Sequence, residues 1–222
     1  MNTNGPVDQS DRHFLHQTTN TAATETIFTN DVREIGFVMN ASRLWAFQPD
    51  TMTGLFDLLH TTAVAGGLTQ RERGVLVTAT ASTLGDSYCS IAWGSRLATV
   101  IGEHIAAEVL HGDDTNLTET ERAMARWARS ITNDCTATVP DDVDALRRTG
   151  FTDEQIFAMT VYVALRIAFS TVNASLGARP DAAFRSKAPT SVLDAVTFGR
   201  PIAEQATEPP SAIPNQVSPD SL

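Results

Sequence analysis

The chain has little of the material that several common classes of protein require. Its 222 residues include only two cysteines, Cys89 and Cys135, which lie far apart. This excludes a disulfide framework and the cysteine spacing of a zinc site, although a pair between the two stays open. No cluster of His, Asp and Glu has metal-ligand spacing, and no Gly-rich phosphate loop follows a strand. We therefore expect neither a metal nor a cofactor.

Positive charge is also scarce. The formal net charge is -10, and Lys and Arg form no run anywhere. This argues against nucleic acid or an anionic membrane as the main partner. The stretch from Met1 to Glu25 is polar and lacks the apolar core of a signal peptide or a membrane span. We expect a cytoplasmic protein whose partners are small molecules and other protein chains.

The sequence does contain many signals for where helices begin and end. With 42% hydrophobic and 19% charged residues, the length fits one globular domain. Strand alternation is almost absent, and glycines stand where several helices should end. Capping boxes of the form Thr-x-x-Glu/Gln precede three apolar-periodic runs. They are Thr69 to Glu72, Thr118 to Glu121 and Thr152 to Gln155.

These signals predict a helical domain over residues 29–203, with disordered tails at 1–28 and 204–222. The predicted helices cover residues 40–47, 49–65, 70–84, 86–101, 103–111, 119–132, 140–149 and 153–176. The last is apolar nearly all round, which favours a central helix or a subunit contact. Arg166, Ser170 and Thr171 interrupt it, which argues against a membrane span.

The segment Gly85 to Gly94 holds the most reactive side chain. Asp86, Cys89 and Trp93 are spaced i, i+3 and i+7, so they share one face of a helix. Asp86 is also a good N-cap. A helix N-terminus favours the Cys89 thiolate, whereas the nearby carboxylate disfavours it, so we expect a less acidic thiol than that of a Cys-x-x-Cys site.

Several short motifs occur in a recognisable order. They are Gly36-Phe37-Val38 before Gln48-Pro49-Asp50, Arg71-Glu72-Arg73, Tyr88-Cys89-Ser90-Ile91-Ala92, Gly112-Asp113 before Leu117 to Arg122, Gly150 to Ile156, and Phe198-Gly199-Arg200-Pro201. In this order they resemble the alkylhydroperoxidase D (AhpD-like) and carboxymuconolactone decarboxylase family, in its peroxidase-related branch, over about residues 35–181. The resemblance implies an all-α AhpD-like helical bundle that assembles as a homo-oligomer, a trimer or hexamer, through helix packing between subunits.

The resemblance also implies a redox site, most of which is replaced here. Peroxidatic members of the family use a glutamate, a Cys-x-x-Cys pair and a histidine. Cys89 matches the second cysteine, whereas Asp86 stands at the first, Trp93 at the histidine and Gly74 at the glutamate. Glu72 lies about 200° round the helix from the glutamate position, and its simplest role is in the Thr69 capping box.

Three residues are candidates for binding a substrate, each with a structural alternative. Trp93 suits an organic ligand pocket or a filled, inert core. Tyr88 lies on another face than Asp86, where a packing or interface role is the simpler interpretation. His60 could line the pocket or be purely structural.

Three hypotheses for function follow. The first is a family enzyme, peroxidase-like oxidoreductase or cofactor-free lyase, that acts on a small organic acid, lactone or hydroperoxide without the dithiol cycle; Asp86 is the acid or base and Cys89 a supporting thiol. The second is a single-cysteine alkylhydroperoxidase with peroxiredoxin-type activity that uses an external thiol reductant. The third is a non-catalytic binding or assembly protein on the same fold.

Overall fold

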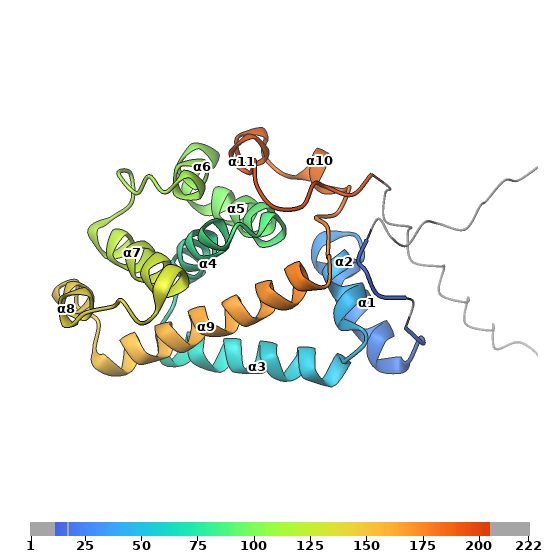
Figure 1. Cartoon of the computed structure of the whole chain (residues 1–222), viewed down its shortest axis with the longest axis horizontal. Coiled ribbons are helices and arrows are strands. Elements are labelled where there is room, and N and C mark those ends of the chain that lie inside the picture. The colour runs from blue at the N-terminus through green and yellow to red at the C-terminus, as the bar shows by residue number, and fades with distance from the viewer. Residues whose placement is uncertain (1–11, 17, 205–222) are drawn as a thin grey trace, which may run out of the picture.

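The part of the chain that the structure describes is helical and contains no strand. The structure is a computed structural model, and it describes residues 12–16 and 18–204. Its helices are α1 (Ala22–Ile35), α2 (Asn40–Trp45), α3 (Pro49–Ala65), α4 (Gln70–Leu84), α5 (Ser87–Ile101), α6 (Glu103–His111), α7 (Glu119–Asp134), α8 (Pro140–Arg148), α9 (Asp153–Ser175), α10 (Phe184–Lys187) and α11 (Thr190–Ala195). In Figure 1, α3 and α9 run side by side, and α4 to α7 lie on the other side of α9 from α3.

Helices begin where the capping boxes predict. The side chains of Thr69, Thr118 and Thr152 each accept a hydrogen bond from the backbone N–H three residues on, and the side chain of that third residue accepts one from the backbone N–H of the capping threonine. These reciprocal bonds satisfy N–H groups that the helix itself leaves unpaired. The three predicted helix starts are therefore confirmed.

The N-terminal tail predicted over residues 1–28 is wrong from Ala22 onward, because α1 begins there. Thr21 caps α1 and forms a capping box with Thr24. Thr24 and Asp31 are buried, so α1 is packed against the domain. Residues 1–11 lie outside the described residues, as does the predicted C-terminal tail beyond Glu204.

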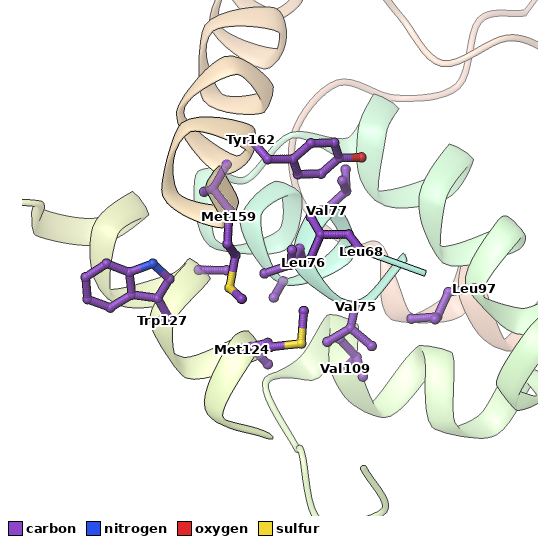
Figure 2. Packing of buried hydrophobic residues seen from close by; sticks show 14 of the residues in the cluster. Leu68, Val75, Leu76, Val77, Leu97, Val109, Met124, Trp127, Met159 and Tyr162 are labelled. Atoms are coloured by element: carbon purple, nitrogen blue, oxygen red, sulfur yellow. The ribbon is translucent and has the colours of Figure 1, made fainter. Parts of the chain in front are cut away.

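The core surrounds α4, which contacts α5, α7 and α9. Val75 and Leu76 of α4 are fully buried, as are Met124 of α7 and Met159 of α9. Figure 2 shows these side chains pointing toward one another. Gly74 allows α5 to approach closely, since a Cβ there would meet Leu97 Cδ1 at 2.9 Å.

One face of helix α9 is buried in the core, and the other is exposed to solvent. Met159, Tyr162 and Arg166 are buried, whereas Phe157 is 72% exposed. By length and composition alone α9 could cross a membrane. Its packing against α3, α4 and α7 accounts for the apolar composition equally well. Assembly into a homo-oligomer and location in the cytoplasm stay predictions.

Candidate functional site at the start of helix α5

The turn between α4 and α5 brings Asp86 and Cys89 together. Gly85 ends α4 in the left-handed conformation, with φ of 69°. Asp86 follows as the N-cap of α5, and its Oδ1 accepts a hydrogen bond from the backbone N–H of Cys89 at 3.2 Å. The predicted capping role of Asp86 is confirmed. Its Oδ2 is buried and has no nitrogen or oxygen donor among the described residues.

The segment Phe198 to Pro201 holds this turn in place. Ser87 Oγ donates a hydrogen bond to the carbonyl oxygen of Arg200 at 2.7 Å. Gly199 lies so close that a Cβ on it would come within 2.6 Å of the Gly85 carbonyl oxygen. The start of α5 is therefore fixed by residues far away in the sequence as well as by its own cap.

Cys89 is a buried thiol in a mixed apolar and polar environment. It is 3% exposed and packs in a cluster with Trp45, Tyr88 and Phe169. Burial, and then the negative charge of Asp86, raise the pKa of Cys89 well above its usual value. A hydrogen bond with Ser170 acts in the opposite direction. This direction agrees with the weakly acidic thiol expected from the sequence, and burial is a larger cause than the charge of Asp86.

Helix α9 supplies two polar groups that the sequence did not assign to the site. The hydrogen bond with Ser170 and the positive charge of Arg166 both lower the pKa of the Cys89 thiol. Arg166 and Ser170 are one helical turn apart, so they present both groups on one face of α9. Their i, i+4 spacing in an apolar helix was the available signal, but it could not show that this face meets Cys89.

Arg166 is a buried cation held mainly by aromatic rings. It is 7% exposed, and its guanidinium carbon lies 4.5 Å from the ring centroid of Trp93 and 5.5 Å from that of Tyr162. Its one hydrogen bond is a long one to Tyr162 Oη, at 3.4 Å, and its Nε has no partner within the described ranges. No described carboxylate oxygen lies within 4.0 Å of its nitrogens. Cation–π contacts of about 0.5 to 2 kcal/mol each offset part of the cost of burying the charge.

Trp93 forms the boundary between the thiol cluster and a small cavity. Its half-buried ring packs against the cluster that contains Cys89. It also lines a cavity of about 240 Å³, whose other walls are Glu34, Gln70, Arg73, Gly74, Arg96 and Leu97. Asp86 and Cys89 are absent from that lining. The three residues predicted to share a face are thus gathered in one region, but only Trp93 reaches the cavity.

Tyr88 is engaged elsewhere. Its hydroxyl donates a hydrogen bond to Asp181 Oδ2 at 2.5 Å and accepts one from the backbone N–H of Ala41 at 3.2 Å. Its ring meets Phe184 edge to face. Both hydrogen-bonding functions of the hydroxyl are therefore occupied, which favours the packing role over substrate binding.

His60, a predicted pocket residue, is exposed on α3, whereas Cys89 is buried. His104 follows Gly102, which separates α5 from α6 as predicted. Glu72 is bound in its capping box, with Oε2 accepting from the Thr69 N–H at 2.8 Å. Both cysteines are free, and within the described ranges no group of His, Cys, Asp and Glu could hold a metal ion.

Comparison with solved structures identifies the fold. No protein-family model and no curated protein sequence matches the chain. A peroxidase-related protein from Ralstonia eutropha JMP134, described as an alkylhydroperoxidase AhpD core, matches with a TM-score of 0.69 and 24% identity over 78% of this chain and 94% of that one. The chain has the AhpD-like fold.

Two further solved structures have a similar fold. A peroxidase-related protein from Silicibacter sp. TM1040 gives a TM-score of 0.70 at 17% identity, over 82% of this chain and 99% of that chain. The debrominase Bmp8, in a cysteine-to-alanine variant in complex with 2,3,4-tribromopyrrole, gives 0.64 at 16% identity, over 81% and 95%. The AhpD-like bundle predicted from the motifs is confirmed as a fold.

Proposed function

We propose that this chain is a cofactor-independent enzyme of the alkylhydroperoxidase D and carboxymuconolactone decarboxylase family that acts on a small organic acid, lactone or hydroperoxide without a dithiol cycle. One observation carries the proposal: the Asp86 carboxylate, which accepts the Cys89 backbone N–H, and the Ser170 and Arg166 groups of α9 all act on the pKa of the buried Cys89 thiol. A buried thiol surrounded by an acid, a hydroxyl and a cation has the groups needed to hold and move a proton.

Proton transfer is the chemistry that this arrangement suits best. Because its pKa is raised, the thiol of Cys89 is protonated near neutral pH and can donate that proton to a substrate carbanion, such as one formed by loss of CO2. The positive charge of Arg166 stabilises the thiolate left behind, since it lowers the pKa of Cys89. It then regains a proton from solvent by way of Asp86, so the cycle consumes one proton and needs no oxidant or reductant.

The test is turnover by matched variants. The protein is assayed against a panel of small lactones, organic acids and hydroperoxides, and any substrate found is given to Asp86→Asn and Cys89→Ser. We expect both to lose most of the activity, since general acid–base groups contribute about 10² to 10⁴ in rate. Cys135→Ser is the control, because Cys135 is an exposed free thiol on another helix end. Unchanged turnover in both site variants would refute the assignment.

A single-cysteine peroxidase is the second candidate. Ser170 and Arg166 both favour the Cys89 thiolate. That thiolate would attack a hydroperoxide, releasing the alcohol and leaving a sulfenic acid, which two external thiols would reduce to thiol and water with formation of their disulfide. Dimedone trapping at neutral pH tests this: labelling of Cys89 supports the peroxidase, and an unlabelled Cys89 under excess peroxide eliminates it.

A non-catalytic role is favoured by one observation, the absence of Cys89 and Asp86 from the cavity lining. A binding or assembly protein of this fold would keep the thiol closed off in every state. Hydrogen exchange and alkylation then distinguish the cases. In an enzyme, small alkylating reagents should reach Cys89 under native conditions. In a closed, non-catalytic protein, Cys89 should be alkylated only as fast as the protein unfolds.

A further inference from the structure

Helix α2 forms one wall of the apolar cluster that buries the thiol. Its residues Ala41, Leu44 and Trp45 belong to the same cluster as Cys89, and Trp45 Nε1 donates a hydrogen bond to Asn173 Oδ1 of α9 at 2.8 Å. The other helices of the cluster, α4, α5 and α9, are long and also pack in the main core. Helix α2 has six residues and packs chiefly against α1. Because it has few contacts, α2 is the wall that opens at the lowest cost.

Asp181 fastens the start of α2 to α5. Its Oδ1 accepts the backbone N–H of Asn40 at 2.8 Å, and its Oδ2 accepts the hydroxyl of Tyr88 at 2.5 Å. The Tyr88 hydroxyl in turn accepts the backbone N–H of Ala41 at 3.2 Å. One buried carboxylate thus satisfies two N–H groups of α2, one directly and one through the tyrosine. That tyrosine immediately precedes Cys89 in the chain.

The protonation of Asp181 is coupled to its burial. Burial raises its pKa to about 7 from an ordinary value of 3.8. Among its neighbours, Tyr88 of α5 and Arg43 of α2 lower this pKa, and Asp31 of α1 raises it. If α2 swings away, water reaches the carboxylate and its pKa returns toward the ordinary value. Opening then releases a proton between pH 3.8 and about 7, so it becomes more favourable as pH rises through this window.

We propose that α2 is a lid over Cys89, that the hydrogen-bonded pair of Asp181 and Tyr88 is its latch, and that ionisation of Asp181 weakens the latch. In the closed state Cys89 is 3% exposed and lies outside the lining of the cavity at Trp93. Opening of α2 removes one wall of the cluster and lets small molecules reach the thiol. This inference rests on the proposed function, to which it adds a route of entry, but opening is measured without a substrate.

Hydrogen exchange of the full chain measures the opening. The amides of α2 are followed from about pH 5 to about pH 8 and corrected for the intrinsic exchange rate. We expect them to open more readily than those of α4, with an opening constant that increases by up to about tenfold per pH unit and levels off above about pH 7. Asp181→Asn should lose this increase and retain only what Asp31, whose pKa is also raised, contributes.

Tyr88→Phe tests the latch while Asp181 stays in place. It removes the acceptor of the Ala41 N–H and the donor to Asp181, so α2 should open about tenfold more often. Tyr162→Phe is the matched control, because the hydroxyl of this buried tyrosine bonds to Arg166 on its own helix and should not affect α2. If Asp181→Asn fails to fold, Tyr88→Phe still decides.

Alkylation shows whether α2 is the route to the thiol. In a Cys135→Ser background and at one pH, alkylation of Cys89 should rise in Tyr88→Phe by the same factor as α2 opening. Any of three results would overturn the lid: α2 amides as protected as those of α4, a pH profile of α2 opening that Asp181→Asn leaves unchanged, or α2 opening in Tyr88→Phe without faster alkylation.

The outcomes separate this inference from the proposed function. Rapid native alkylation of Cys89 while α2 stays protected means that the thiol is reached by another route, which refutes the lid alone. An α2 that opens as expected, in a protein whose turnover does not depend on Asp86 and Cys89, refutes the proposed function alone and supports the lid.

Discussion

The carboxylate of Asp86 both starts helix α5 and raises the pKa of the thiol of Cys89. Its Oδ1 accepts the Cys89 backbone N–H at 3.2 Å, and its charge is the second largest cause, after burial, of the raised thiol pKa. In a Cys-x-x-Cys frame the same position would hold a resolving thiol. Here one side chain both caps the helix and favours the neutral, protonated form of the Cys89 thiol.

Asp86→Asn should lower the pKa of Cys89. Asparagine caps a helix about as well as aspartate, so the fold is kept while the negative charge is removed. The pKa is measured from the pH dependence of alkylation, in a Cys135→Ser background so that only Cys89 reacts. Asp86→Ala is the comparison: it also removes the charge but loses the cap, at about 1 kcal/mol of stability. An unchanged pKa in Asp86→Asn would show that the charge of Asp86 does not contribute to it.

The sequence was sufficient for most helices because their ends are encoded locally. The boxes at Thr69, Thr118 and Thr152 and the left-handed Gly85 and Gly112 need only near neighbours, and the structure confirms them. Helix α1 was missed because its box is Thr21 with Thr24, which lacks the Glu or Gln of the usual pattern. The short helices α10 and α11 depend on tertiary burial of residues such as Val192, which periodicity over a few residues does not reveal.

The site was only partly predictable, for a physical reason. Asp86, Cys89 and Trp93 lie within two turns of one helix, so spacing alone relates them. Arg166 and Ser170 come from α9, and the contact between α9 and the start of α5 is a property of the bundle. Arg166 was interpreted as an interruption of an apolar helix, and its burial against Trp93 could not be deduced from periodicity.

Gly199→Ala should destabilise the protein by about 2 kcal/mol. Gly199 has φ of 71°, and a Cβ would lie 2.6 Å from the Gly85 carbonyl oxygen and 2.8 Å from the Ser87 nitrogen, so backbone would have to move. Gly112→Ala is the control, since Gly112 has φ of 83° with open space around it and should show only the left-handed strain of about 1 kcal/mol. Urea unfolding measures both. Equal losses would mean that Gly199 does not hold the start of α5.

Asp181→Asn should remove a pH dependence of stability. Burial raises the pKa of Asp181 to about 7, from 3.8 in the unfolded chain. Between these values the folded state holds a proton that the unfolded state has released, so the free energy of unfolding falls as pH rises through this window. Asp31, whose pKa is also raised, still makes the free energy of unfolding fall as pH rises in the variant. His13, whose pKa is lowered, still makes it rise with pH. Urea titrations from pH 4 to pH 8 compare the two proteins. Parallel profiles would contradict the assignment.

Arg166→Met should leave stability unchanged or raise it by about 1 kcal/mol or more. Arg166 is buried without a carboxylate partner in the described part of the chain, and replacing buried charge by an apolar side chain of similar length is often neutral or stabilising. The variant should also raise the pKa of Cys89 further, because the charge of Arg166 lowers it. Urea unfolding and the alkylation profile measure the two effects on the same sample. A large loss of stability would assign Arg166 a structural role, whereas a stable variant with a shifted thiol pKa means that the charge is retained for the site.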